Sequence, residues 1–248
     1  MTTGGEGIVT AAVLVIGDEI LSGRTKDKNI GAIADHLTAI GIRLREVRIV
    51  GDDEPMIIEA IRALRERYDY LFTTGGIGPT HDDITADCVA KALGVPIGLD
   101  ERAVAILKER YTPEELTPAR LRMARIPEGA ALIRNDVSKA PGFMIGNVIV
   151  MAGVPAIMRS MLENVTPMLR TGRKVVSRTI RVNEPEGKIA DILGEVQRQF
   201  PSVAMGSYPF FEERYGTNLV LRSTETDTLD SACDALLDAL RAEGMALG

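Results

Sequence analysis

Tryptophan is absent from this 248-residue sequence, and cysteine and histidine occur only twice each. The two cysteines, Cys88 and Cys233, lie far apart on the apolar stripes of predicted helices, which favours buried thiols over a disulfide or a nucleophile. The two histidines, His36 and His81, have no cysteine or second histidine at ligand spacing. A zinc site is therefore not expected.

Basic clusters and long apolar runs are missing as well. A net charge of −6 and an isoelectric point near 5.2 argue against binding to nucleic acid or to an anionic membrane. No apolar run reaches the length of a membrane-spanning helix, and residues 1–7 lack the basic residue that opens a signal peptide. We therefore expect a cytoplasmic protein that binds neither nucleic acid nor membrane.

Two common phosphate-binding loops are also absent. A dinucleotide fingerprint needs a third glycine where His81 stands after Gly76 and Gly78. The nearest candidate for a Walker loop begins at Gly17, but one residue too many separates its glycines and Arg24 replaces the lysine. Neither loop explains how this chain would hold a phosphate.

Strand-like and helix-like segments alternate along the first two thirds of the chain. Continuous apolar runs favour buried strands, and apolar residues three and four apart favour helices. The order strand, helix, strand, helix, strand predicts a parallel sheet with right-handed crossovers. The predicted strands are residues 9–16, 42–50, 70–72 and 148–151, and the main helical stripes are residues 30–40, 57–64, 84–93 and 157–169.

The pattern changes near residues 171–173. Beyond this point the order is strand, helix, strand, strand, helix, with no glycine-rich loop. We therefore predict an α/β domain of residues 1–171, built in three layers around a mostly parallel sheet. A small α+β module of residues 172–248 follows it.

The stretch TTGGIGPTHDDIT joins a predicted strand to a predicted helix. Its glycines, Gly75, Gly76 and Gly78, allow positive φ and close approach to the backbone, and a helix start beyond such glycines is an anion site. The adjacent carboxylates of Asp82 and Asp83 would repel a bare phosphate unless a divalent metal lies between them. The loop therefore predicts a phosphate-containing ligand with Mg²⁺, Mn²⁺ or Co²⁺.

Two more acidic pairs follow predicted strands. Asp18 with Glu19 and Asp52 with Asp53 stand at strand ends that should meet the glycine loop at one edge of the sheet. Carboxylates in such a cleft can hold a magnesium-like ion while substrate phosphates complete its coordination. The ion would then lower the pKa of a bound water.

The glycine loop resembles that of the molybdopterin-binding family, whose members carry Thr-Thr-Gly-Gly-x-Gly followed by an acidic residue and a threonine. Its Gly-Pro-Thr and paired aspartates are similar to the competence/damage-inducible (CinA-type) branch and to the front domain of eukaryotic FAD synthases. Three more stretches agree with that branch: GDEILSG from Gly17, VGDD from Val50, and APGF from Ala140 followed by AGVP from Ala152.

The resemblance assigns roles to individual residues. It implies a catalytic set of Asp52, Asp82 and Asp83, and the last two are also our candidate metal ligands. It further implies a ligand-binding set, with the three glycines as the cradle for the terminal phosphate. That set is Gly17, Asp18, Glu19, Ser22, Thr74, Gly75, Gly76, Gly78, Pro79, Thr80 and Gly142, and we add Lys139 to it for its charge beside the pocket.

Each of these residues also has a purely structural explanation. Asp82 or Asp83 could cap the helix from Ile84, and Asp52 the helix at Glu54, while the glycines serve the turn alone. His81 could touch a ligand or face solvent. Residues 116–140 hold five basic and two acidic side chains, which face either a ligand's phosphates or water.

The sequence departs from the family pattern just before Ala140. Members usually carry a glycine and a small residue there, whereas this chain has Ser138 and Lys139. Lys139 would add a positive charge beside the pocket, so it bears on which ligand the pocket accepts.

Three functions remain open. The resemblance implies metal-dependent hydrolysis of a nucleotide pyrophosphate such as ADP-ribose or FAD, or binding of molybdopterin and its adenylylated form. A nucleotide-binding regulatory module without turnover is the third. The paired aspartates favour hydrolysis, because a passive phosphate cradle does not need them. We expect a homo-oligomer, and no nicotinamide-nucleotide deamidase activity, since 248 residues leave no room for that module of longer CinA-type proteins.

Overall fold

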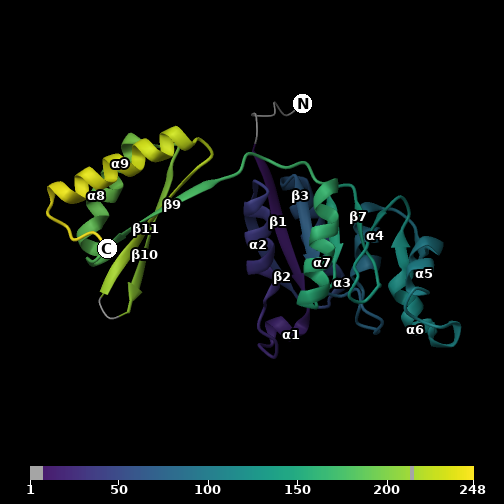
Figure 1. Ribbon diagram of the computed structural model, residues 1–248. Coiled ribbons are helices and arrows are strands. Elements are labelled where there is room, and N and C mark those ends of the chain that lie inside the picture. Colours follow the sequence, from purple (N-terminus) through teal and green to yellow (C-terminus); the bar gives the residue numbers. More distant parts are fainter. Residues whose placement is uncertain (1–7, 213–214) are drawn as a thin grey trace. The chain divides into compact units, whose positions relative to one another are not determined.

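The structure is a computed structural model that describes residues 8–212 and 215–248. The chain divides into two compact units, Met1–Gly172 and Arg173–Gly248, and Figure 1 labels most of their helices and strands. No helix in the described part of the chain is long and apolar enough to cross a membrane.

A six-stranded sheet forms the centre of the first unit. Its first four strands are parallel neighbours, and β7 pairs antiparallel with the strand on each side. The mostly parallel α/β fold predicted from the sequence is therefore confirmed. In spatial order the strands are β2 (Ile42–Val50), β1 (Val9–Ile16), β3 (Tyr70–Thr74), β8 (Val148–Met151), β7 (Gly142–Ile145) and β6 (Ala131–Ile133).

Strand β1 explains the three layers. Leu14 and Ile16 point into the core on one face of the sheet, while Val13 and Val15 point into the core on the other. A strand that is apolar on both sides must be covered on both sides. One face carries α3 (Glu54–Arg67), α4 (Thr85–Leu93) and α5 (Glu101–Leu107), and the other carries α2 (Asn29–Ala39) and α7 (Pro155–Val165).

Several short elements differ from the sequence-based expectation. The predicted loop after β1 begins with a helical turn, α1 (Asp18–Leu21), and strands β6 and β7 were not expected. The edge strand expected near Pro96 is β4 (Ile97–Leu99), which pairs with β5 (Arg125–Pro127) in a separate two-stranded sheet. The remaining short helices are η1 (Pro113–Glu115), α6 (Pro118–Leu121), η2 (Arg122–Ala124) and η3 (Thr166–Met168).

The second unit has the predicted order of strand, helix, two strands and helix. Its three antiparallel strands lie in the order β10-β11-β9. Its core combines Leu219 and Leu221 of the middle strand with apolar residues of both helices, among them Leu236. The elements are β9 (Val176–Val182), α8 (Glu186–Gln199), β10 (Ala204–Phe211), β11 (Tyr215–Ser223) and α9 (Thr226–Ala242).

Candidate functional site

The glycine loop runs from the carboxyl end of β3 to the start of α4, as the sequence predicts. Gly75 and Gly76 have φ of +108° and +66°, in the region that favours glycine. A Cβ atom on Gly75 would lie 2.1 Å from the carbonyl oxygen of Ile16, and one on Gly76 would lie 2.2 Å from Thr85 Oγ1. Packing against β1 and α4 therefore requires both glycines, whatever the loop binds.

Thr85 fixes the direction of the peptide groups in this loop. Its hydroxyl donates to the carbonyl oxygen of Gly75 at 3.0 Å, and its N–H donates to that of Gly76 at 3.0 Å. In the described residues, the N–H groups of Gly76, Ile77 and Gly78 have no acceptor. Three successive N–H groups without acceptors are available as donors to an anion.

A cavity of about 360 Å³ opens beside the loop. Gly75–Gly78 and the carboxylates of Glu19 and Asp83 form its polar side, together with Ser138. Its volume lies in the range usual for small-molecule sites. Large and apolar residues from loops and from α7 also line it: Tyr111, Met123, Ala140, Val154, Ile157 and Met161.

The first two acidic loops meet beside this cavity. The N–H of Asp18 donates to Asp52 Oδ2 at 3.0 Å. Burial raises the pKa of Asp52, and the negative charges of Asp18, Glu19 and Asp82 raise it further, against the hydrogen bond from Asp18. Strand ends that are far apart in sequence thus bring carboxylates into electrostatic contact, as the parallel sheet predicts.

Asp82 and Asp83 do not cap α4. The residue before that helix is Ile84, and no side chain caps its N-terminus. Asp83 Oδ2 instead accepts the N–H of Thr80 at 2.8 Å. Hydrogen bonding with the Thr80 side chain, then with its own backbone N–H, lowers the pKa of Asp82, which is exposed.

The capping alternative for Asp52 is also wrong. Asp53, one residue later, caps α3 by accepting the N–H of Met56 on Oδ1 at 3.0 Å. Asp52 instead accepts the N–H of Asp18 in the first loop. In the VGDD stretch, the second aspartate caps helix α3 and the first contacts the loop of the candidate site.

Several predicted ligand-binding residues have structural partners. Thr74 is buried and donates to the carbonyl oxygen of Ala152 at 2.9 Å. A Cβ on Gly142, which is buried in β7, would lie 2.3 Å from the carbonyl oxygen of Val150. Gly17 donates to the carbonyl oxygen of β2 residue Val50, and Ser22 ends α1 in an exposed position. Pro79 lies on the cavity wall.

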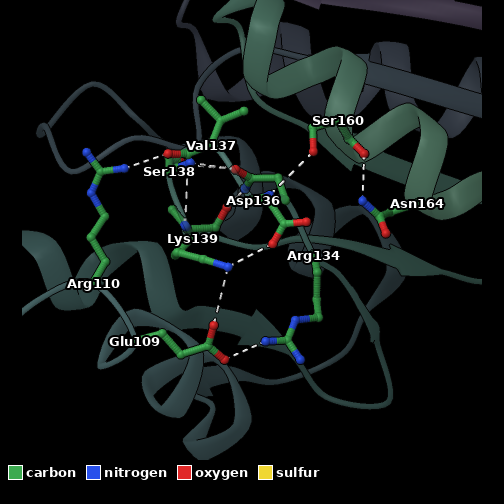
Figure 2. Close-up of polar contacts among 11 residues, drawn as sticks. Glu109, Arg110, Arg134, Asp136, Val137, Ser138, Lys139, Ser160 and Asn164 are labelled. Atoms are coloured by element: carbon green, nitrogen blue, oxygen red, sulfur yellow. Dashed lines mark hydrogen bonds and ion pairs between the residues drawn. The ribbon is translucent and has the colours of Figure 1, made fainter.

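Lys139 does not present a free charge to the cavity. Its ammonium group lies 2.7 Å from Asp136 Oδ1 and 3.5 Å from Glu109 Oε2, and Glu109 also pairs with Arg134. Figure 2 shows the ammonium between the two carboxylates. Lys139 is the one non-glycine residue with positive φ in the described parts of the chain, at 62°. Its neighbour Ser138 lines the cavity instead.

Three residues of the site were missed by the sequence analysis. Asn29, which is 5% exposed, donates to Thr74 Oγ1 at 2.8 Å and to the carbonyl oxygen of Gly153 at 2.7 Å, tying α2 to the ends of β3 and β8. Tyr111 lines the cavity, and Arg122 lies against the glycine loop at Asp83. No motif marks these residues, because the folded chain alone brings them to the loop.

The described residues that line the cavity include no histidine and no cysteine. The His81 side chain is 98% exposed, with Nδ1 3.9 Å from Asp82 Oδ1. Cys88 and Cys233 are buried free thiols. Burial raises the pKa of Cys88 to about 12, so its thiol is protonated at neutral pH and is not a nucleophile.

The acidic edge fits a metal only in part. Within residues 8–212 and 215–248, no three Asp, Glu, His or Cys side chains gather closely enough to hold a metal ion. Mg²⁺ commonly binds one or two carboxylates and completes its coordination with water and substrate phosphates. Asp83 lines the cavity whereas Asp82 is exposed and does not, so an ion beside them would take most of its ligands from phosphate and water.

Comparison with known proteins agrees with this geometry. Residues 12–171 match the family described as "Probable molybdopterin binding domain", and residues 174–246 match the middle domain of FAD synthase. A crystal structure from Thermoplasma acidophilum, described as the protein CinA with unknown function, is similar with 38% identity and a TM-score of 0.61, covering 65% of this chain and 98% of that one.

Full-length relatives extend the similarity over both units. A protein of Pyrococcus furiosus is 33% identical over 239 residues, which are 90% of this chain and 94% of the relative. A CinA-like protein of Desulfosudis oleivorans is 36% identical over 239 residues, which are 90% of this chain and 58% of that protein. The chain therefore belongs to the molybdopterin-binding domain family, in its CinA-type branch.

Proposed function

We propose that this protein hydrolyses a nucleotide pyrophosphate, such as ADP-ribose or FAD, with the help of a divalent metal. The observation that carries the proposal is that backbone N–H groups without acceptors and carboxylates line one cavity. The unpaired N–H groups of Gly76, Ile77 and Gly78 form an anion cradle, and carboxylates from the neighbouring loops stand beside it. A cradle that only stored a phosphate would be weakened by these negative charges.

The perturbed acidities suggest a division of labour. The pKa of Asp82 is lowered by hydrogen bonding, so this carboxylate stays ionised and suits a metal. The pKa of Asp52 is raised by burial and by neighbouring carboxylates, which suits proton transfer.

Asp82 and Asp83 are the residues that would hold Mg²⁺, Mn²⁺ or Co²⁺. The ion, when bound, neutralises phosphate charge and makes a bound water more acidic. Asp52 would accept a proton from the attacking water, whose oxygen joins one phosphorus as the bridging P–O bond breaks. The glycine-loop N–H groups stabilise the charge that develops on the phosphate oxygens. With ADP-ribose the products would be AMP and ribose 5-phosphate.

The second candidate is binding of molybdopterin or its adenylylated form. The family match and the cavity wall of Tyr111, Met123 and Ile157, which would accept a flat ring system, favour it. A terminal phosphate of the pterin would occupy the same N–H cradle. This candidate gives no role to the raised pKa of Asp52, and we rank it second for that reason.

A turnover screen separates these candidates. Purified full-length protein is incubated with ADP-ribose, FAD, NAD or diadenosine phosphates and each metal in turn, and products are resolved by chromatography. Hydrolysis that EDTA abolishes supports the proposal. Tight molybdopterin binding without turnover of any nucleotide would favour the cofactor-binding candidate. Saturable nucleotide binding without products would instead identify a regulatory module.

A further inference from the structure

Three arginines lie close together in the sequence, Arg120 in α6, Arg122 in η2 and Arg125 in β5. Arg125 pairs with Asp87, at 2.5 Å between Nη2 and Oδ1. Arg120 donates to the carbonyl oxygen of Glu115 at 2.7 Å and lies 4.4 Å from the centre of the Tyr111 ring. Both guanidinium groups therefore have good partners within the chain.

Arg122 is different from its two neighbours. Its side chain is half-buried, and among the described residues no carboxylate pairs with it. Its single hydrogen bond, from Nη2 to the carbonyl oxygen of Asp83, is long at 3.5 Å. Its Nε is enclosed and has no hydrogen-bond partner within residues 8–212 and 215–248. A buried donor on a charged group is costly when no acceptor meets it.

The position of Arg122 indicates which acceptor would complete it. Arg122 lines a small cavity of about 20 Å³ together with Gly76, Gly78 and Asp83. The glycine loop and Met123 line both this cavity and the larger one. The guanidinium thus stands beside the glycine loop and Asp83, where no carboxylate of the described residues pairs with it.

We propose that Arg122 binds the second phosphate of a diphosphate whose first phosphate rests on the N–H groups of Gly76, Ile77 and Gly78. This inference rests on the proposed function and adds a selectivity: the site prefers diphosphates to monophosphates. A guanidinium suits this task because its fork of N–H donors matches two phosphate oxygens at once. Nε has no partner among the described residues and Nη2 makes one long hydrogen bond to Asp83, so the donors of this fork are not fully used within the chain.

A structural role for Arg122 is the competing explanation. A cavity of about 20 Å³ is large enough for one water molecule, which would satisfy Nε without any ligand. In that case Arg122 would only support the loop at Asp83. A structural role predicts equal effects of substitution on all ligands, whereas a phosphate contact predicts an effect on diphosphates alone.

The test measures binding of inorganic pyrophosphate and of orthophosphate by calorimetry, at fixed Mg²⁺, to the wild type and to Arg122→Gln and Arg122→Lys. The wild type should bind pyrophosphate more tightly than orthophosphate. Arg122→Gln should weaken pyrophosphate binding by about 30-fold, the scale of a lost charged hydrogen bond, and change orthophosphate binding less than threefold. The pyrophosphate affinity of Arg122→Lys should lie between those of the wild type and Arg122→Gln, because lysine keeps the positive charge but lacks the forked donors.

Arg120→Gln is the matched control. It removes the same charge from a side chain that is two residues away in the sequence and lines neither cavity. It should leave both affinities unchanged. The inference would be overturned if the Arg122 variants lost affinity equally for both anions, or lost affinity for neither. It would also be overturned by a wild type with no preference for pyrophosphate, which is measured even if a variant misfolds. Selective pyrophosphate binding without ADP-ribose turnover would leave Arg122 in place and remove the proposed hydrolysis.

Discussion

Asp52 combines a structural contact with a perturbed acidity, and the two lead to a prediction about stability. Because burial raises its pKa, the folded chain holds the proton of Asp52 more tightly than the unfolded chain. The folded state therefore loses stability as pH rises from the unfolded pKa, near 3.8, through the raised pKa. At pH 7 the ionised carboxylate of Asp52 therefore lowers the free energy of unfolding.

Asp52→Asn should accordingly raise the melting temperature at pH 7, since the amide oxygen can still accept the N–H of Asp18. The advantage should shrink as pH falls toward 4, where the wild-type carboxyl also becomes neutral. Calorimetric scans at both pH values measure the difference. A variant that melts lower than the wild type at pH 7 would show that the contact with Asp18 outweighs the desolvation of the carboxylate.

Individual residues differ in how far their roles could be predicted. Gly75 and Gly76 were identifiable because positive φ and close packing leave no alternative to glycine. Asn29 and Arg122 were not, since an asparagine before a helix and an arginine in a basic stretch are ordinary in many contexts. Their roles depend on what β3, β8 and the glycine loop place beside them.

At the level of elements, helix α3 separates capping from function in the VGDD stretch. Asp53 caps this helix, whereas Asp52 does not. Asp53→Ala should lower the free energy of unfolding by about 1 kcal/mol, the usual value of a lost N-cap, and leave turnover per folded molecule nearly unchanged. Urea denaturation and a matched activity assay measure both effects. A large loss of turnover with unchanged stability would move Asp53 into the site.

The predictable elements are those that carry a repeated pattern. Strand β1 is apolar at every position that meets either core, and α4 has an apolar stripe closed by Gly94 in the left-handed conformation. Strands β6 and β7 and helix α1 are only three or four residues long, which is too short to show a period. They form because a neighbouring strand or loop supplies the partner.

For the molecule as a whole, each unit has its own core. Two apolar clusters flank the large sheet, and a third lies wholly within Arg173–Gly248. We predict that residues 1–172 remain soluble and unfold cooperatively on their own, because the strand and helix alternation is complete there. Circular dichroism during thermal unfolding tests this expectation. An insoluble fragment, or one that melts without a cooperative transition, would contradict it.

The central claim is that the carboxylates beside the glycine loop serve chemistry and not helix capping. The most direct measurement is the rate of ADP-ribose cleavage with Mg²⁺, Mn²⁺ or Co²⁺ by the wild type, Asp82→Asn and Asp83→Asn, with Asp53→Asn as the control that alters a true cap. Asparagine keeps the shape of aspartate and removes its charge. The account predicts that both site variants keep the metal-free melting temperature while turnover falls by roughly a hundredfold or more, and that the control stays active. Near-full activity in both variants, with unchanged metal dependence, would contradict the account and leave a binding role.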